Sequence, residues 1–549
     1  MLKKLLLLAH TIRFLKPIQF YWRFYLKIKQ LFPFSVVIKE SVRIRQVDLM
    51  PSVIKHSSLS STQFCFLNEV GSAELPIAWN ADQMSKLWLY NLHYFDYLNQ
   101  QHVDQQFVVD LMQDWVKQNP VGSGNGWEPY TLSLRIVNWV KFLSQPEQGN
   151  EQLNILYDSL FLQSRYLFKH LEYHLLGNHL FKNSVALMFA GVFFEGKEAE
   201  DWLAKGCEII TQQTKEQVLD DGGHFERSPM YHVLILEDIL DCINLDKAVS
   251  CFSSGEVDFM QAKAIAMLGF LVDIVHQDNE IPFFNDCALD IAPSPDAVIN
   301  YADKLGVKFI KSYERFGVIE KPDFGLVVLQ NKRSKLIFDN GFIGPDYLPG
   351  HAHCDTLSYE LSLAGKRCIV NSGTYQYAGD ERNLFRATNA HNTVQIDGVE
   401  QHEIWSTFRV ARRAYPFDVV VRKFSEDEIE CSASISGFRQ LAGSPVHKRV
   451  LRYQKDQIIV NDMIVAKGEH FAESFIHLHP DVEIINTLSN SIKLKLGQVD
   501  FLIHTLGELK IDIETGWFSP EFGVKTKNIV LVLRKQSTCP FSFGYKVCF

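Results

Sequence analysis

The sequence has no closely spaced pair of cysteines. Its ten cysteines are scattered, without a Cys-x-x-Cys motif or a regular spacing. This argues against a disulfide framework and indicates free thiols in a reducing compartment. After the N-terminus there is no apolar run long enough to span a membrane. A surplus of positive charge is also lacking: with 55 basic and 64 acidic residues the net charge is −9, so the chain has no overall field that would attract nucleic acid, and no nucleic-acid partner is expected.

The first thirty residues have a pattern of their own. An apolar run over residues 5–9 follows two lysines, but His10 and Arg13 interrupt it and no small-residue cleavage site follows, so it does not read as a signal peptide. Residues 11–30 are basic and aromatic, which suits either peripheral contact with an anionic membrane or docking on the protein itself. We expect a cytoplasmic or membrane-peripheral protein, and a periplasmic location stays open.

Length and hydrophobic period indicate two large domains. A chain of 549 residues exceeds what one hydrophobic core usually supports. Apolar residues recur at helical spacing through residues 105–276, with Gly-rich turns between the segments, which predicts helical hairpins packed around a common centre. From about residue 323 short runs of strand-forming residues follow one another without helical patterns between them, so a large antiparallel sandwich is expected. The boundary is predicted near residues 295–322.

Histidines are concentrated in two short segments of the strand-rich half. Residues 350–355 read Gly-His-Ala-His-Cys-Asp, and residues 390–392 read Ala-His-Asn. Because strands hold side chains in fixed relative positions, imidazoles placed there suit a metal site or proton transfer near neutral pH. The alternative is that they are ordinary polar loop histidines without a common role.

Four further segments combine polar and aromatic residues in a way that suits binding or catalysis. They are residues 177–183, with Asn178 and His179 at a helix start, residues 221–232, residues 126–139 and residues 382–392. Each has a structural alternative: Asn178 would serve as an N-cap, Tyr231 as a buried phenol with a satisfied hydroxyl, and the aromatic residues as core. A tyrosine near a cation would lose its proton more readily than in water.

In combination, residues 177–179, 227–232, 350–355, 373–375 and 390–394 resemble the heparinase II/III-like family of polysaccharide lyases, over roughly residues 85–540. The resemblance implies an N-terminal incomplete (α/α) toroid followed by a C-terminal antiparallel β-sandwich, with the substrate between them. The expected domains are a basic and aromatic N-terminal extension (1–84), the toroid (85–310) and the sandwich (311–549).

The resemblance also implies a chemistry, the β-elimination of a uronate-containing polysaccharide. It places Asn178 and His179 at the substrate carboxylate, gives Tyr231 the role of base and acid, and lets His351 assist from the sandwich. The expected partner is an acidic polysaccharide or oligosaccharide, within surface-polysaccharide metabolism. The residues expected to contact the substrate are Trp127, Arg135, Arg227, His232, Tyr377 and Arg386.

A metal site is a further expectation from the resemblance. His353 and His391 match metal ligands of some family members, but Asn371 stands where an aspartate is expected, and a neutral amide is a poorer ligand for zinc than a carboxylate. The chemistry itself requires no cofactor, so a metal here, zinc or calcium, would be structural.

Two other functions stay open at this point. One is a non-catalytic carbohydrate-binding or assembly protein with a spent lyase site. The other is a glycoside hydrolase, which needs two carboxyl groups on opposite sides of the scissile bond. Glu226 with Asp286 or Asp221 would be the candidate pair.

Overall fold

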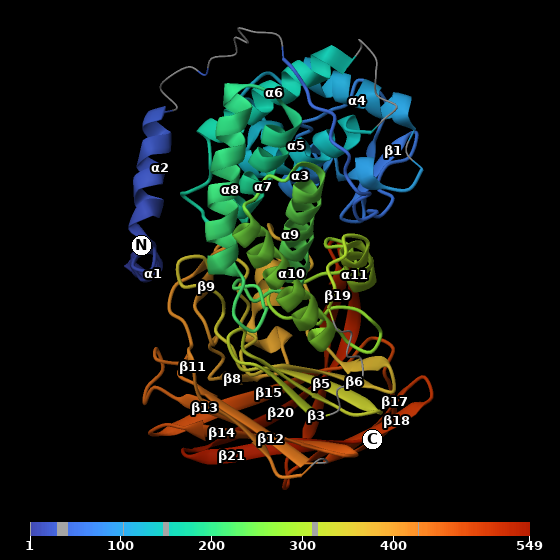
Figure 1. Cartoon of the computed structure of the whole chain (residues 1–549). Helices are drawn as coiled ribbons and strands as arrows, with labels where there is room; N and C mark the ends of the chain where they lie inside the picture. Colours follow the sequence, from blue (N-terminus) through green and yellow to red (C-terminus); the bar gives the residue numbers. More distant parts are fainter. Residues whose placement is uncertain are drawn as a thin grey trace.

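The computed structural model describes residues 2–29, 34, 42–102, 104–145, 153–309, 317–425 and 428–549. In Figure 1 helices form the upper part of the molecule and strands the lower part. Two helices near the N-terminus, α1 (Leu2–Ile12) and α2 (Pro17–Lys29), lie along one side of the helical domain. Among the described residues, no helix is both long enough and apolar enough to cross a membrane.

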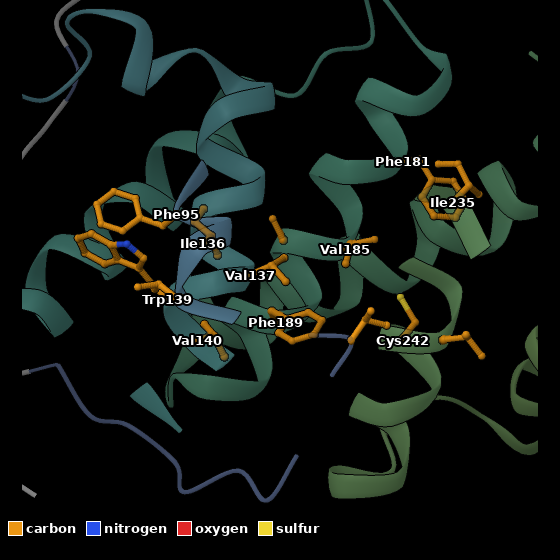
Figure 2. Packing of buried hydrophobic residues seen from close by; sticks show 14 of the residues in the cluster. Phe95, Ile136, Val137, Trp139, Val140, Phe181, Val185, Phe189, Ile235 and Cys242 are labelled. Atoms are coloured by element: carbon orange, nitrogen blue, oxygen red, sulfur yellow. The ribbon is translucent and has the colours of Figure 1, made fainter. Parts of the chain in front are cut away.

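The helical domain is built from antiparallel neighbours joined by short turns. Its helices are α3 (Lys86–Tyr94), α4 (Gln105–Gln118), α5 (Pro129–Leu143), α6 (Asn154–Lys169), α7 (Gly177–Phe193), α8 (Lys197–Gln217), α9 (Pro229–Val249), α10 (Ser254–Ile274) and α11 (Pro295–Lys304), with the 3-10 turns η1 (Asp96–Asn99) and η2 (Asn125–Trp127). Figure 2 shows part of its core, with Ile136 of α5, Phe189 of α7 and Ile235 of α9 among the buried residues of one cluster. Side chains are buried on nearly every side of α7 and α9, as expected of central helices.

Part of the predicted N-terminal extension belongs to the helical core. The hairpin of β1 (Gln63–Phe66) and β2 (Glu69–Ser72) places Phe64 against Tyr97, with ring centroids 5.3 Å apart, and Phe66 against Trp88, at 5.2 Å. Both phenylalanines are buried. The hairpin is therefore a layer of the helical domain, because its apolar residues have no other place to be buried.

The strands pair antiparallel and form three larger sheets in the part of the chain that the structure describes. Their orders are β3-β4-β5-β6-β7, β19-β20-β15-β8 and β11-β12-β13-β14-β21-β18-β17-β16. The strands are β3 (Gly317–Lys321), β4 (Leu326–Gln330), β5 (Ser334–Asp339), β6 (Tyr359–Leu363), β7 (Lys366–Ile369), β8 (Val394–Ile396), β9 (Ile404–Trp405), β10 (Arg409–Val410), β11 (Pro416–Lys423), β12 (Glu428–Ile435), β13 (Val446–Gln454), β14 (Gln457–Val465), β15 (Glu469–His477), β16 (Glu483–Leu488), β17 (Ser491–Leu496), β18 (Val499–Thr505), β19 (Ile511–Glu521), β20 (Val524–Thr538) and β21 (Phe541–Cys548).

The first of these sheets joins the two domains. On β4, Val328 belongs to a cluster with Phe270 of α10, whereas Val327 and Leu329 belong to the core of the sandwich. Because the strand is covered on both faces, it reads as a continuous apolar run rather than as an alternation. The predicted order of a helical toroid followed by antiparallel strands is confirmed, with one short interruption at α12 (Arg382–Arg386) and η4 (Thr388–Ala390).

Candidate active site

Side chains from both domains meet at the junction between them. Tyr231 lies in the first turn of α9, and His351 lies in the loop between β5 and β6. Their ring centroids are 3.9 Å apart with an angle of 31° between the planes, and the Tyr231 hydroxyl is 3.1 Å from that of Tyr377. The structure thus brings a phenol, an imidazole and a second phenol together from three distant segments.

Tyr231 is held by the start of its helix. Ser228 is the N-cap: its Oγ accepts from the Tyr231 N–H at 3.2 Å and donates to the Asp286 carbonyl at 2.5 Å. The tyrosine is buried, and this burial is the main reason why the pKa of Tyr231 lies well above its ordinary value. The neighbouring Tyr377 and Tyr130 raise the pKa further. In the free protein the Tyr231 phenol therefore loses its proton less readily than a tyrosine in water, which is opposite in direction to the expected effect of a nearby cation.

His351 is oriented by a buried carboxylate. Its Nδ1 donates to Asp286 Oδ2 at 2.9 Å, and the Asp286 backbone N–H donates to the His351 carbonyl at 2.9 Å. Asp286 also accepts from His353 Nε2 at 2.8 Å and from both Nη atoms of Arg382. Burial by itself would raise the pKa of Asp286, but Arg382 and the two histidines hold it well below its usual range. Because the Asp286 carboxylate fixes the proton on Nδ1, His351 presents Nε2 as its basic atom.

Asn178 and Glu226 lie beside His351. Asn178 Nδ2 donates to both Glu226 oxygens, at 3.0 and 2.9 Å, and Glu226 Oε2 is 3.6 Å from His351 Nε2. Gly177, at φ +58°, allows this approach, since a Cβ there would lie 2.7 Å from Glu226 Oε1 and 2.1 Å from Leu348. The N-cap of α7 is Leu176, so the alternative that Asn178 caps this helix is wrong. The amide hydrogens of Asn178 are held by Glu226 rather than free for a ligand.

His179 forms the more exposed end of the cluster, with 32% of its side chain accessible. Its Nδ1 is 3.1 Å from Glu172 Oε1, and its ring lies 4.5 Å from that of Tyr130. Glu172 is held in turn by Asn183, whose Nδ2 donates to Oε2 at 3.0 Å. Burial acts to lower the pKa of His179, but the Glu172 carboxylate outweighs it and the pKa is raised. His179 is therefore suited to meeting an anion as a cation.

Several predicted substrate contacts lie in the interior of the fold instead of at its surface. Arg135 is fully buried and donates to Gln163 Oε1 and to the carbonyls of His93 and Gly126. Trp127 packs on Trp115 and donates to the Asn119 carbonyl. His232 Nε2 bonds to the Met267 carbonyl. Arg386 donates to the carbonyls of Ala352, Ser406 and Thr407. These four side chains are buried and bond mainly to carbonyl oxygens of the fold, although His232 Nδ1 and one Nη atom of Arg386 have no hydrogen-bond partner.

Two predicted contacts have other positions. Arg227 lies at the interface between the domains, where it donates to the Phe324 carbonyl and stacks over Phe342. Tyr377 is half-buried and joins the cluster through Tyr231, with Arg382 over its ring at 5.2 Å. Of the predicted contacts, Tyr377 is the one that the structure places beside Tyr231 and His351.

The predicted metal ligands lie close together but form an incomplete donor set. The rings of His353 and His391 are 5.3 Å apart, and His391 Nδ1 is 3.3 Å from Asn371 Oδ1. Burial lowers the pKa of His353 to about 4 and that of His391 well below its usual value, so both are neutral; His353 Nδ1 and His391 Nε2 have no hydrogen-bond partner. Within the described part of the chain, no group of three His, Cys, Asp or Glu side chains is placed to hold a metal. Two imidazoles and an amide fall short of a closed zinc site.

The carboxylates considered for a hydrolase are already engaged. Asp286 is fully buried between Arg382, His351 and His353, and both oxygens of Glu226 accept from the Asn178 amide. Asp221 accepts from the Phe324 and Gly223 backbone N–H groups at 2.7 and 3.0 Å. No two of these three are free to act as the acid and base of glycoside hydrolysis.

Sequence reasoning missed the residues that support the cluster. Glu172 and Arg382 were not singled out for a role, and Asp286 was considered only as a hydrolase carboxylate. Arg382 and Asp286 lie 96 residues apart, so no spacing signals their pairing. Glu172 lies only seven residues before His179, but outside helix α7, so no helical spacing links the two. Asn183, one helical turn after His179, was a usable signal, because it indicated a second polar side chain on the same face.

Two family models together match most of the chain. One, described as heparinase II/III N-terminus, matches residues 82–303, and the other, described as heparinase II/III-like, C-terminal, matches residues 316–545. The matched segments coincide with the helical domain and the strand domain.

Relatives and solved structures agree with these matches. The chain is 26% identical over 313 residues to a heparin-sulfate lyase of Pedobacter heparinus, covering 52% of this chain and 47% of that protein. A heparin-sulfate lyase of Bacteroides stercoris is 23% identical over 347 residues, with 54% and 50% covered. The chain thus spans about half the length of these relatives. A crystal structure of heparinase III is similar at a TM-score of 0.71 and 18% identity, covering 87% of this chain and 80% of that one; at this identity the likeness shows a shared fold.

Proposed function

Because the chain belongs to the heparinase II/III-like family, we propose that it is a polysaccharide lyase that cleaves a uronate-containing polysaccharide by β-elimination. The observation that carries the proposal is the contact of the Tyr231 phenol with the His351 imidazole, which Asp286 orients from behind. A proton acceptor and a proton donor in contact are what the reaction needs at adjacent carbons of one sugar ring.

The negative charge of the substrate carboxylate must be neutralised before elimination, because the proton on the neighbouring C5 is only weakly acidic. His179 is partly exposed, and Glu172 raises its pKa, which favours the imidazolium; it would pair with that carboxylate and stabilise the enediolate that forms. Asn178 would add an amide if the substrate shares or displaces its bond to Glu226. Neither residue requires a metal, and no step passes through His353 or His391.

The elimination then needs one base and one acid. His351 Nε2 would take the C5 proton, and the electron pair of that C–H bond would form the C4–C5 double bond. The C4–O bond breaks, its electron pair goes to the departing oxygen, and Tyr231 protonates that oxygen. Return of the proton from the His351 imidazolium to the tyrosinate restores the resting state. In the other assignment Tyr231 is both base and acid; its raised pKa favours the phenol as the acid in the free protein.

The polymer is proposed as an acidic polysaccharide, within surface-polysaccharide metabolism. The supporting relatives are heparin-sulfate lyases. The test is incubation of the purified chain with heparan sulfate, alginate and other uronate polymers, following the ultraviolet absorbance of a new unsaturated uronate. Cleavage of one polymer, lost in His351→Ala, supports the proposal. Tight binding of a polymer without cleavage would instead support a carbohydrate-binding protein with a spent site.

A further inference from the structure

The two N-terminal helices have one face attached to the protein and one face left uncovered. On the attached side, Trp22 of α2 stacks on Tyr173 with ring centroids 4.8 Å apart, and Gln19 Nε2 donates to the Leu175 carbonyl at 3.2 Å. On α1, Thr11 Oγ1 accepts from Trp405 Nε1 of the strand domain at 3.0 Å. The pair is therefore held by both domains and carries its outer face at a fixed position (Figure 1).

The outer face is unusually apolar for a surface. On α2, Tyr21, Phe24 and Ile28 follow one another at helical spacing, and Phe24 is 68% exposed. Contiguous exposed apolar side chains of this size mark an interaction site rather than ordinary surface. The exposed large apolar side chains of the two helices are Leu5, Leu6, Leu8, Ile12, Ile18, Phe20, Tyr21, Phe24, Tyr25 and Ile28.

Positive charge accompanies this face. Residues 2–29 contain seven lysine and arginine residues and no aspartate or glutamate, in a chain whose net charge is −9. Like charges are crowded there: partial burial and the neighbouring Lys169 lower the pKa of Lys29 to about 8, and burial and Arg409 lower that of Arg23. An anionic surface would relieve this repulsion.

We propose that α1 and α2 form a docking surface for an anionic lipid membrane, on which the two helices lie flat with their aromatic and aliphatic side chains in the headgroup region. A helix with apolar side chains on one face and flanking bases binds in this manner. A soluble polyanion would explain the bases but not the exposed leucine, isoleucine and phenylalanine side chains. This inference does not depend on the proposed lyase function.

The connection between the two helices is also attached to the helical domain and to the loop that carries His351. Lys16, between the two helices, pairs with Glu216 of α8 at 2.5 Å and lies over the ring of Tyr347 at 3.8 Å. Tyr347 belongs to the loop that leads to His351.

The test is co-sedimentation of the full chain with vesicles of phosphatidylcholine containing phosphatidylglycerol, with pure phosphatidylcholine vesicles for comparison. We expect binding to the anionic vesicles that weakens as salt is raised. Arg23→Glu with Lys27→Glu should weaken it at least about tenfold, and Tyr21→Ser with Phe24→Ser should weaken it at low and high salt alike. Phe424→Ser, which changes a side chain of 56% exposure on the strand domain, is the matched control and should bind like the wild type.

The outcomes separate lipid from other occupants. Unchanged vesicle binding in both double variants, with melting temperatures like the wild type, would overturn the proposal. So would a wild type that ignores the vesicles but binds a soluble acidic polysaccharide through Arg23 and Lys27. A mass in solution that doubles with concentration, and returns to the monomer in Tyr21→Ser with Phe24→Ser without any vesicle binding, would assign the face to a second copy of the chain.

Discussion

The imidazole of His351 lies on the phenol ring of Tyr231, with ring centroids 3.9 Å apart, although one residue comes from the strand domain and the other from the first turn of a toroid helix. Neither residue could hold this position alone. Ser228 caps the helix that carries Tyr231, and Asp286 fixes the His351 ring. The contact therefore depends on correct docking of the two domains, and changes at the junction should affect turnover before they affect either core.

Tyr231→Phe should lower turnover by roughly 10²–10⁴-fold and leave polysaccharide binding nearly intact, because it removes the proton donor and keeps the ring. Initial rates of unsaturated-uronate formation and a separate binding titration measure the two effects. Tyr157→Phe, a half-buried tyrosine of α6 outside the cluster, is the control and should leave both unchanged. Full activity in Tyr231→Phe would remove Tyr231 from the chemical step.

Glu172→Gln should shift the pH profile. Glu172 raises the pKa of His179 above 6.5 against the opposing effect of burial, so the histidine is cationic at low pH and its contribution is lost as pH rises through that pKa. The stability that the Glu172–His179 pair adds follows the same direction. It is fully present below the pKa that His179 has in the unfolded chain, and it is lost as the pH rises through the higher pKa of the folded protein. In the variant, the fall in kcat/KM should move to lower pH. An unchanged alkaline limb would show that His179 does not act as a cation.

Asp286→Asn should destabilise the protein by about 3–5 kcal/mol, because it leaves the buried Arg382 guanidinium without its counterion. The pKa of Asp286 is lower in the folded protein than in the unfolded chain. The stability that its carboxylate adds is therefore present above the pKa of the unfolded chain and is lost as the pH falls through the pKa of the folded protein. The difference between variant and wild type should therefore be full at neutral pH and shrink in strong acid. Denaturant unfolding at several pH values measures it; a constant difference would contradict the assignment.

His391→Ala should lower the free energy of unfolding by roughly 2–4 kcal/mol through the cavity that it leaves, with a smaller effect on turnover than Tyr231→Phe. Metal analysis of wild type and variant belongs with the melting curves. One equivalent of metal that disappears in the variant would assign His391 to a structural metal. If the wild type contains no metal and the variant still loses this stability, His391 is a packing residue at the strand junction. A loss of turnover as large as that of Tyr231→Phe would contradict both.

Much of the architecture was readable from the sequence. The period of apolar residues changes from helical to strand-like near residues 295–322, and the structure changes from α11 to β3 over the same region. Periodicity determines this because it sets which side of each segment can be buried. Asn178, Tyr231 and His351 were found because they stand in short motifs, and the structure gathers them around Glu226.

The tertiary structure decided which polar residues are available and what supports them. Arg135 reads as a charged residue on an amphipathic helix, yet it is buried because three oxygen acceptors from other segments satisfy its guanidinium. Asp286 has no local signal, because it lies 65 residues from His351, yet it sets the orientation of that ring. Glu172 lies seven residues before His179, and only the fold brings its carboxylate onto the imidazole and raises the pKa of His179. Burial and pairing between distant segments depend on how the chain is packed, and local periodicity carries no information about them.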